Sequence, residues 1–285
     1  MTSWVQQKSN RVSYIARTGP GPTVIFLHGI GSNSGSFEPL ANQLPDHFNL
    51  IAWNAPGYLG SNALDDPWPM PADYASILDK FLKRIGVKRA HIVGHSLGTL
   101  IAVSFARKFS ERVVTLTLAS TANGYNVERL TPLPPKVSNR IVELERLGPL
   151  EFAQSRAANL VYDPQNNQSV VSQVESAMAQ VNLRGYAQAA HLLASGNLPL
   201  DLERTSICPN FIIGAEDSVT PISQTQVAAK AWATKHGRSP VIHEIADAGH
   251  AVYLQKPAAF CKALLDCFAR SCRPDPTPVP KRKEV

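Results

Sequence analysis

The stretch AHIVGHSLG, residues 90–98, carries the pattern that decides the fold. Residues 90–93 are typical of a short strand, and the apolar run from residue 97 onward has the period of a helix. Between them lies G-x-S-x-G, which in this position predicts a very sharp turn. Strand and helix would then approach too closely for a Cβ at Gly94 or Gly98. We expect strained backbone at Ser96, with its hydroxyl lifted above the sheet.

Composition places the chain among ordinary globular proteins. Of its 285 residues, 44% are hydrophobic and 18% charged, which favours a sizeable core over disorder. The net charge of +6 is spread along the chain without a basic stripe interleaved with aromatic residues, so we expect no nucleic-acid partner. The start lacks the apolar run of a secretory signal, and no stretch approaches the roughly 18 apolar residues of a membrane span. The four cysteines lack C-x-x-C spacing. We therefore expect a cytoplasmic protein without a membrane partner, disulfide scaffold or zinc site.

Except in the middle of the chain, short apolar runs alternate with segments whose apolar residues have a helical period. This pattern is typical of a mostly parallel sheet that is covered by helices on both faces. The clearest helices are expected at residues 73–85, 97–109 and 257–268. The sequence thus predicts the α/β class. The expected strands lie at 11–16, 23–27, 50–53, 90–93, 113–119, 210–213 and 241–245, with a weaker one near Trp4.

Residues 123–202 break this alternation, because they show several helical periods and no good strand. We expect a helical insertion here, between a first core part at 1–122 and a second core part at 203–272. Residues 273–285 are rich in proline, end in basic residues and are predicted to form a disordered tail. The expected helices of the insertion cover 137–147, 150–160, 169–180 and 183–194.

A serine hydroxyl becomes a good nucleophile when a neighbouring base takes its proton, so Ser96 requires a histidine that follows a later strand. His250 meets this requirement, because it follows strand 241–245. A carboxylate that orients the histidine is expected at another strand end, where Asp217 follows strand 210–213. Glu216 is its competitor, and two further acids are remoter alternatives. The sequence predicts Ser96 as nucleophile, His250 as general base and Asp217 as orienting acid. The remoter alternatives are Asp201 and Asp247.

The oxyanion of a tetrahedral intermediate needs two backbone N–H donors. Leu97 follows the nucleophile and is expected to supply one of them. The loop HGIG, residues 28–31, follows strand 23–27 and is expected to supply the other through Ile30, with glycines keeping the backbone approachable. A glycine-rich turn without a ligand is the alternative for this loop. This chemistry requires no metal and no organic cofactor.

Five motifs resemble the α/β-hydrolase superfamily, in particular small bacterial esterases, 3-oxoadipate enol-lactonase-like members and meta-cleavage-product hydrolase-like members. The resemblance spans residues 23–269 and implies an eight-stranded, mostly parallel sheet with a helical cap inserted after the sixth strand. One loop departs from these relatives, because Asn54 replaces their usual aspartate and GYLGS at 57–61 replaces G-x-G-x-S. That loop is expected to differ in shape. The motifs are FLHG at 26–29, WNAPGY at 53–58, GHSLG at 94–98, GAED at 214–217 and GH at 249–250.

The resemblance implies that the insertion covers the serine and shapes a mostly apolar cavity. We therefore expect a small, largely apolar ester or lactone as the substrate. Three basic cap residues are candidates for binding a substrate carboxylate, with exposed surface charge as the alternative. The candidate substrate-binding residues are Gly29, His95, Arg156, Arg184, Tyr186 and His191.

Two other functions remain open from the sequence. One is carbon–carbon bond hydrolysis of meta-cleavage ring-fission products. The relatives with that activity usually carry asparagine beside the serine and tryptophan after the histidine, where this chain has His95 and Ala251. The other is a non-catalytic or cofactor-free oxygenase-like role, since fold alone does not grant activity. The sequence also leaves open a homodimer.

Overall fold

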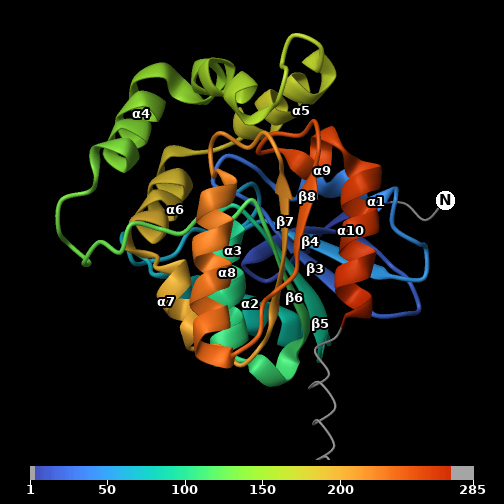
Figure 1. Cartoon of the computed structure of the whole chain (residues 1–285). Helices are drawn as coiled ribbons and strands as arrows, with labels where there is room; N and C mark the ends of the chain where they lie inside the picture. Colours follow the sequence, from blue (N-terminus) through green and yellow to red (C-terminus); the bar gives the residue numbers. More distant parts are fainter. Residues whose placement is uncertain (1–3, 271–285) are drawn as a thin grey trace, which may run out of the picture.

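A single eight-stranded sheet forms the centre of the computed structural model, which describes residues 4–270 (Figure 1). The strand order is β1-β2-β4-β3-β5-β6-β7-β8. Strand β2 runs antiparallel to both of its neighbours, and the pairs from β4 to β8 are parallel. The predicted α/β class and eight-stranded sheet are confirmed. The strands are β1 Val5–Ser9, β2 Val12–Arg17, β3 Thr23–Leu27, β4 Asn49–Trp53, β5 Ala90–His95, β6 Val113–Ala119, β7 Pro209–Gly214 and β8 Ile242–Ile245.

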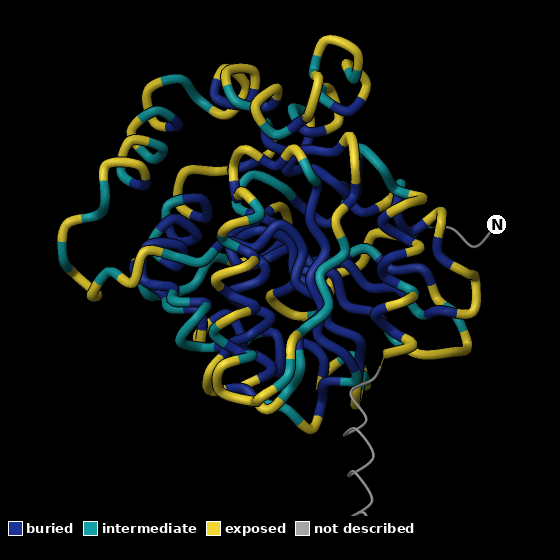
Figure 2. Tube along the Cα trace, in the orientation of Figure 1, coloured by how far each residue is buried: buried dark blue, intermediate teal, exposed yellow. Residues whose placement is uncertain are grey.

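Helices cover both faces of this sheet (Figure 1). The central strands are therefore buried on both sides, which explains why they are apolar almost throughout (Figure 2). Within residues 4–270, no helix combines the length and the apolar character that crossing a bilayer requires. One face carries α1 Glu38–Ala41, α9 Val252–Gln255 and α10 Pro257–Ala269, and the other carries α2 Pro71–Arg84, α3 Leu97–Lys108, α7 Leu198–Glu203 and α8 Ile222–His236.

Three further helices follow β6 in the chain; the first two lie over the ends of the strands, and the third lies lower, beside α3 (Figure 1). They are α4 Pro135–Arg156, α5 Gln168–Met178 and α6 Leu183–Ser195. The predicted break between helices at 137–147 and 150–160 is confirmed, because the backbone at Gly148 (φ +71°, ψ 168°) is not helical and α4 consists of two helices that meet there. The second of them ends at Arg156, four residues earlier than predicted. Helix α7 packs on α3 and α8, so the last helix of the predicted insertion contacts the helices of the sheet. The predicted tail at 273–285 lies outside the described residues.

Candidate active site

Ser96 lies at the tight turn between β5 and α3. Its φ of 52° and ψ of −118° place it in a region that residues with side chains rarely adopt. A Cβ added to Gly94 would lie 2.5 Å from the carbonyl oxygen of Gly98. A Cβ on Gly98 would lie 2.1 Å from the carbonyl oxygen of Leu27. Both glycines are therefore required for the contact between strand and helix that holds Ser96 at the carboxyl end of β5.

Asp217 and His250 form a buried pair at the ends of β7 and β8. The His250 Nδ1 atom lies 3.0 Å from Asp217 Oδ2 and 3.2 Å from Oδ1. Asp217 Oδ1 also accepts hydrogen bonds from the amides of Val219 and Thr220, and the Thr220 hydroxyl donates to Oδ2. Burial alone raises the pKa of Asp217, but His250 and these hydrogen bonds outweigh it and lower the pKa to about 2. The carboxylate is thus ionised and fixed towards the imidazole.

The backbone of His250 is held by its own set of contacts. His95 Nε2 lies 2.8 Å from the carbonyl oxygen of His250 and donates to it, and the Ser120 hydroxyl lies 3.3 Å from the same oxygen. Burial, together with the nearby His250, lowers the pKa of His95 to about 3, so His95 stays neutral. The next amide, that of Ala251, donates to Leu160 on the segment after α4. His95 thus lies behind the loop of His250 and helps to position it.

Ser96 and His250 face one cavity of about 330 Å³. Within the described residues, no hydrogen bond joins the Ser96 hydroxyl to the imidazole. Such contacts are often long before a substrate binds. The structure therefore brings the three predicted catalytic residues to one place, with the acid and the histidine already paired.

The loop after β3 lies directly against Ser96. A Cβ added to Gly29 would lie 3.1 Å from the Ser96 Cβ, so this loop passes close beside Ser96 and leaves little room for a side chain. Gly29 and Ile30 line the same cavity as Ser96, and Leu97 lines an adjoining hollow together with Ile30 and Ser96. Both predicted oxyanion donors thus belong to residues that line the space beside Ser96.

His28 fixes the orientation of the peptide that carries the Ile30 amide. The Ala55 amide donates to His28 Nε2 at 3.0 Å, so the ring proton is on Nδ1, which donates to the carbonyl of Gly29 at 2.8 Å. Burial lowers the pKa of His28 to about 4, against the effect of the Gly29 bond, so the ring stays neutral. Because the carbonyl and amide of one peptide point in opposite directions, a held Gly29 carbonyl also fixes the Ile30 N–H.

We expect His28→Gln to lower kcat for an ester substrate about 10- to 100-fold, with little change in KM, because a loose oxyanion donor weakens transition-state binding. His91→Gln is the matched control. His91 is another buried histidine of low pKa, but it packs on Phe48 and Phe268 in the core. Steady-state kinetics on folded protein would check this. Equal loss of kcat in both variants would contradict a role for His28 in the oxyanion loop.

The loop at residues 54–61, which departs from the pattern of the relatives, contacts the segment that follows β3. Asn54 accepts a hydrogen bond from the Ser34 amide at 2.9 Å and donates to the Ser13 hydroxyl at 2.9 Å. The Tyr58 hydroxyl donates to the carbonyl of Ile30. Gly57, with φ +84°, packs so closely on Gly185 of α6 that a Cβ would lie 2.5 Å from its Cα. The loop therefore connects the segment that carries Ile30 to helix α6.

Of the candidate substrate-binding residues, four line the cavity and two do not. Arg184 donates to the carbonyl of Leu64 at 3.0 Å, and the ring of His191 packs on Trp68 at 4.3 Å. Both are on α6 and face away from Tyr186, because residues two and five positions apart do not share a helix face. The structure thus gives Arg184 and His191 no contact with the cavity. The four that line it are Gly29, His95, Arg156 and Tyr186.

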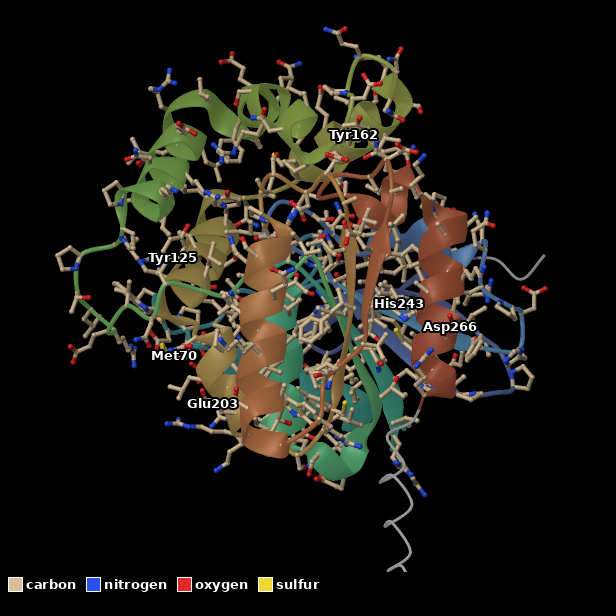
Figure 3. The ribbon with its side chains drawn as sticks, in the orientation of Figure 1. Met70, Tyr125, Tyr162, Glu203, His243 and Asp266 are labelled. Atoms are coloured by element: carbon tan, nitrogen blue, oxygen red, sulfur yellow. The ribbon has the colours of Figure 1, made fainter. Side chains whose placement is uncertain are left out.

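The lining residues that are not among the sequence candidates include two cations and a tyrosine. Lys136 and Arg140 belong to the first two turns of α4. Tyr125, labelled in Figure 3, lies on the segment between β6 and α4. Lys136 and Arg140 are four residues apart, so they share a helix face. That spacing is readable from the sequence, but the direction of the face is not.

Comparisons with known proteins identify the family and agree with the fold. A model of the alpha/beta hydrolase family matches residues 24–263, and the chain belongs to that family. The resemblance inferred from the motifs is thereby confirmed. A pimeloyl-[acyl-carrier protein] methyl ester esterase of Chromobacterium violaceum is 26% identical, over 89% of this chain and 96% of the relative. A 3-oxoadipate enol-lactonase 2 of Acinetobacter baylyi is 24% identical, over 85% of this chain and 87% of the relative. The crystal structure of the enol-lactonase from Burkholderia xenovorans has the same fold, with a TM-score of 0.78, 18% identity and coverage of 93% and 100%.

Proposed function

We propose that the chain is a serine hydrolase that cleaves a small carboxylic ester or lactone through an acyl-enzyme. One observation carries the proposal. Ser96, on its strained turn, shares a cavity with a histidine whose Nδ1 is paired with a buried carboxylate at 3.0 Å. This is the arrangement that converts a serine hydroxyl into a nucleophile. The esterase and enol-lactonase among the relatives support the choice of ester or lactone over other bonds.

The reaction proceeds in two halves. Ser96 Oγ attacks the substrate carbonyl while His250 Nε2 takes its proton, and ionised Asp217 stabilises the imidazolium. The N–H groups of Ile30 and Leu97 donate to the oxyanion. Collapse of this intermediate expels the alcohol, which takes the proton from His250. Water then attacks the acyl-enzyme by the same route and releases the acid.

We also propose that helices α4 to α6 act as a cap over Ser96. Residues of this segment line the cavity, among them Leu160 and Met178. The segment is hydrogen-bonded to the histidine loop through the Ala251 amide and the carbonyl of Leu160. A cap of this kind excludes water and selects the substrate.

A fluorophosphonate probe tests the proposal on the native chain. The probe phosphonylates a serine only when a base activates it, so we expect one adduct, on the peptide that contains Ser96. Intact-mass and peptide-mass measurements would locate it. Heat-denatured protein is the control and is expected to stay unlabelled. An adduct on another residue, or hydrolysis of p-nitrophenyl acetate without any labelling of Ser96, would refute the proposed nucleophile.

A further inference from the structure

The cavity beside Ser96 has a strongly basic wall. Lys136, Arg140 and Arg156 line it, and all three belong to α4. Among the described residues that line this cavity and the adjoining hollow, there is no aspartate or glutamate. A substrate that enters this cavity therefore meets an excess of positive charge that comes from one helix.

Two of the three cations lack a counter-ion. Arg156 is paired with Glu143 at 2.8 Å and lies over the ring of Phe152, so its charge is partly neutralised. Lys136 and Arg140 form no ion pair within residues 4–270. Unpaired charges on a cavity wall attract an anionic ligand. Arg140 is half-buried and Lys136 is exposed, so water and salt screen the attraction of Lys136 more strongly.

Tyr186, a second lining residue, interacts with Arg140. Its side chain is buried and forms a hydrogen bond with Arg140. Burial raises the pKa of Tyr186 and Arg140 opposes the rise, which fits a guanidinium close to the phenol. The partner of the Arg140 guanidinium is therefore a neutral phenol, which does not cancel the positive charge as a carboxylate would. A planar, oriented guanidinium suits a carboxylate, which it can bind through two parallel hydrogen bonds.

The basic wall and the serine belong to one connected space. Lys136 and Arg140 line both the cavity of about 330 Å³ and the adjoining hollow of about 370 Å³. Ser96 and Ile30 also line both. A single small molecule can therefore contact the serine at one end and α4 at the other. Apolar side chains occupy much of the wall between, namely Leu160, Val174, Met178, Val219 and Leu254.

We propose that Lys136 and Arg140 bind an anionic group of the substrate, so that the enzyme prefers short esters or lactones that carry a second, ionised acid, a carboxylate above all. This inference rests on the proposed function and specifies its substrate class. The carbon chain of the substrate, between its two acid groups, contacts the apolar wall of the cavity. The reacting carbonyl lies at Ser96, and the free carboxylate lies at α4.

Paired substrates test the proposal. Mono-p-nitrophenyl glutarate carries the second acid, and p-nitrophenyl pentanoate is its neutral counterpart of equal acyl length. We expect the native enzyme to favour the glutarate in kcat/KM, and the double variant Lys136→Met/Arg140→Met to lower the ratio of the two values about 10- to 100-fold. Raising the salt concentration should lower the ratio of the native enzyme. Arg184→Met is the matched control, because Arg184 is a cap arginine that does not line the cavity, and it should leave the ratio unchanged.

Two results would overturn the proposal: a ratio that is the same in native enzyme and double variant, or stronger competitive inhibition by inorganic phosphate than by glutarate. If neither ester is hydrolysed, the proposed function itself fails. The basic wall is then tested separately by calorimetric titration with glutarate. Binding that weakens in the double variant supports an anion site, and no binding to the native chain refutes it.

Discussion

Replacing Ser96 with alanine is expected to lower kcat for a p-nitrophenyl ester by about 10⁵-fold or more. The variant retains the Ile30 and Leu97 amides and the cavity, but it has no atom that can form the acyl-enzyme. What remains is the catalysis that orientation and oxyanion binding give to a water molecule. The initial burst that accompanies acyl-enzyme formation should disappear completely. Stopped-flow and steady-state measurements on the same ester would check both effects.

Ser104→Ala is the matched control for this variant. Ser104 is a buried serine of the same helix, α3, but it does not line the cavity. Thermal melting should show that both variants are folded, since alanine removes only the hydroxyl at either position. Parental activity in Ser96→Ala would end the proposal of a serine nucleophile. Equal losses in both variants would point instead to damage of the helix.

The sheet and the turn at Ser96 could be predicted from the sequence because local chemistry determines them. The apolar runs end where turns begin, and the observed strand ends differ from the predicted ones by only a few residues. Gly94 and Gly98 are needed for close contacts between neighbouring elements, so their spacing in the sequence predicts the sharp turn at Ser96. Asp217 and His250 follow strands of a parallel sheet, and the carboxyl ends of such strands lie at one edge.

The cavity wall could not be predicted in the same way. Helical period shows which residues share a face, but the kink at Gly148 and the packing of the helices on one another determine where that face points. Arg184 and Arg140 are both basic residues of the predicted insertion. Only Arg140 lines the cavity, whereas Arg184 binds the carbonyl of Leu64. The role of His28 also depends on a contact distant in sequence, the Ala55 amide.

Asp217→Asn is expected to lower kcat about 10⁴-fold while leaving the fold intact. An asparagine can keep Oδ1 towards the amides of Val219 and Thr220, as the carboxylate does now. Its NH₂ group then takes the place of Oδ2 and donates to His250 Nδ1. The imidazole proton moves to Nε2, the atom that must accept the proton of Ser96. Catalysis fails because the histidine is present in the wrong tautomer.

Glu216→Gln is the control for the loss of a neighbouring negative charge. Glu216 is exposed, whereas the Asp217 side chain is fully buried, so we expect near-parental kcat for the control. Stability gives a second readout. The pKa of Asp217 is lowered to about 2 from an ordinary value of 3.8, so its ionised form contributes stability above about pH 4 that is lost as the pH falls through about 2. The difference in unfolding free energy between native protein and Asp217→Asn should shrink over that interval. A pH-independent difference, or parental kcat in Asp217→Asn, would show that this carboxylate does not orient His250.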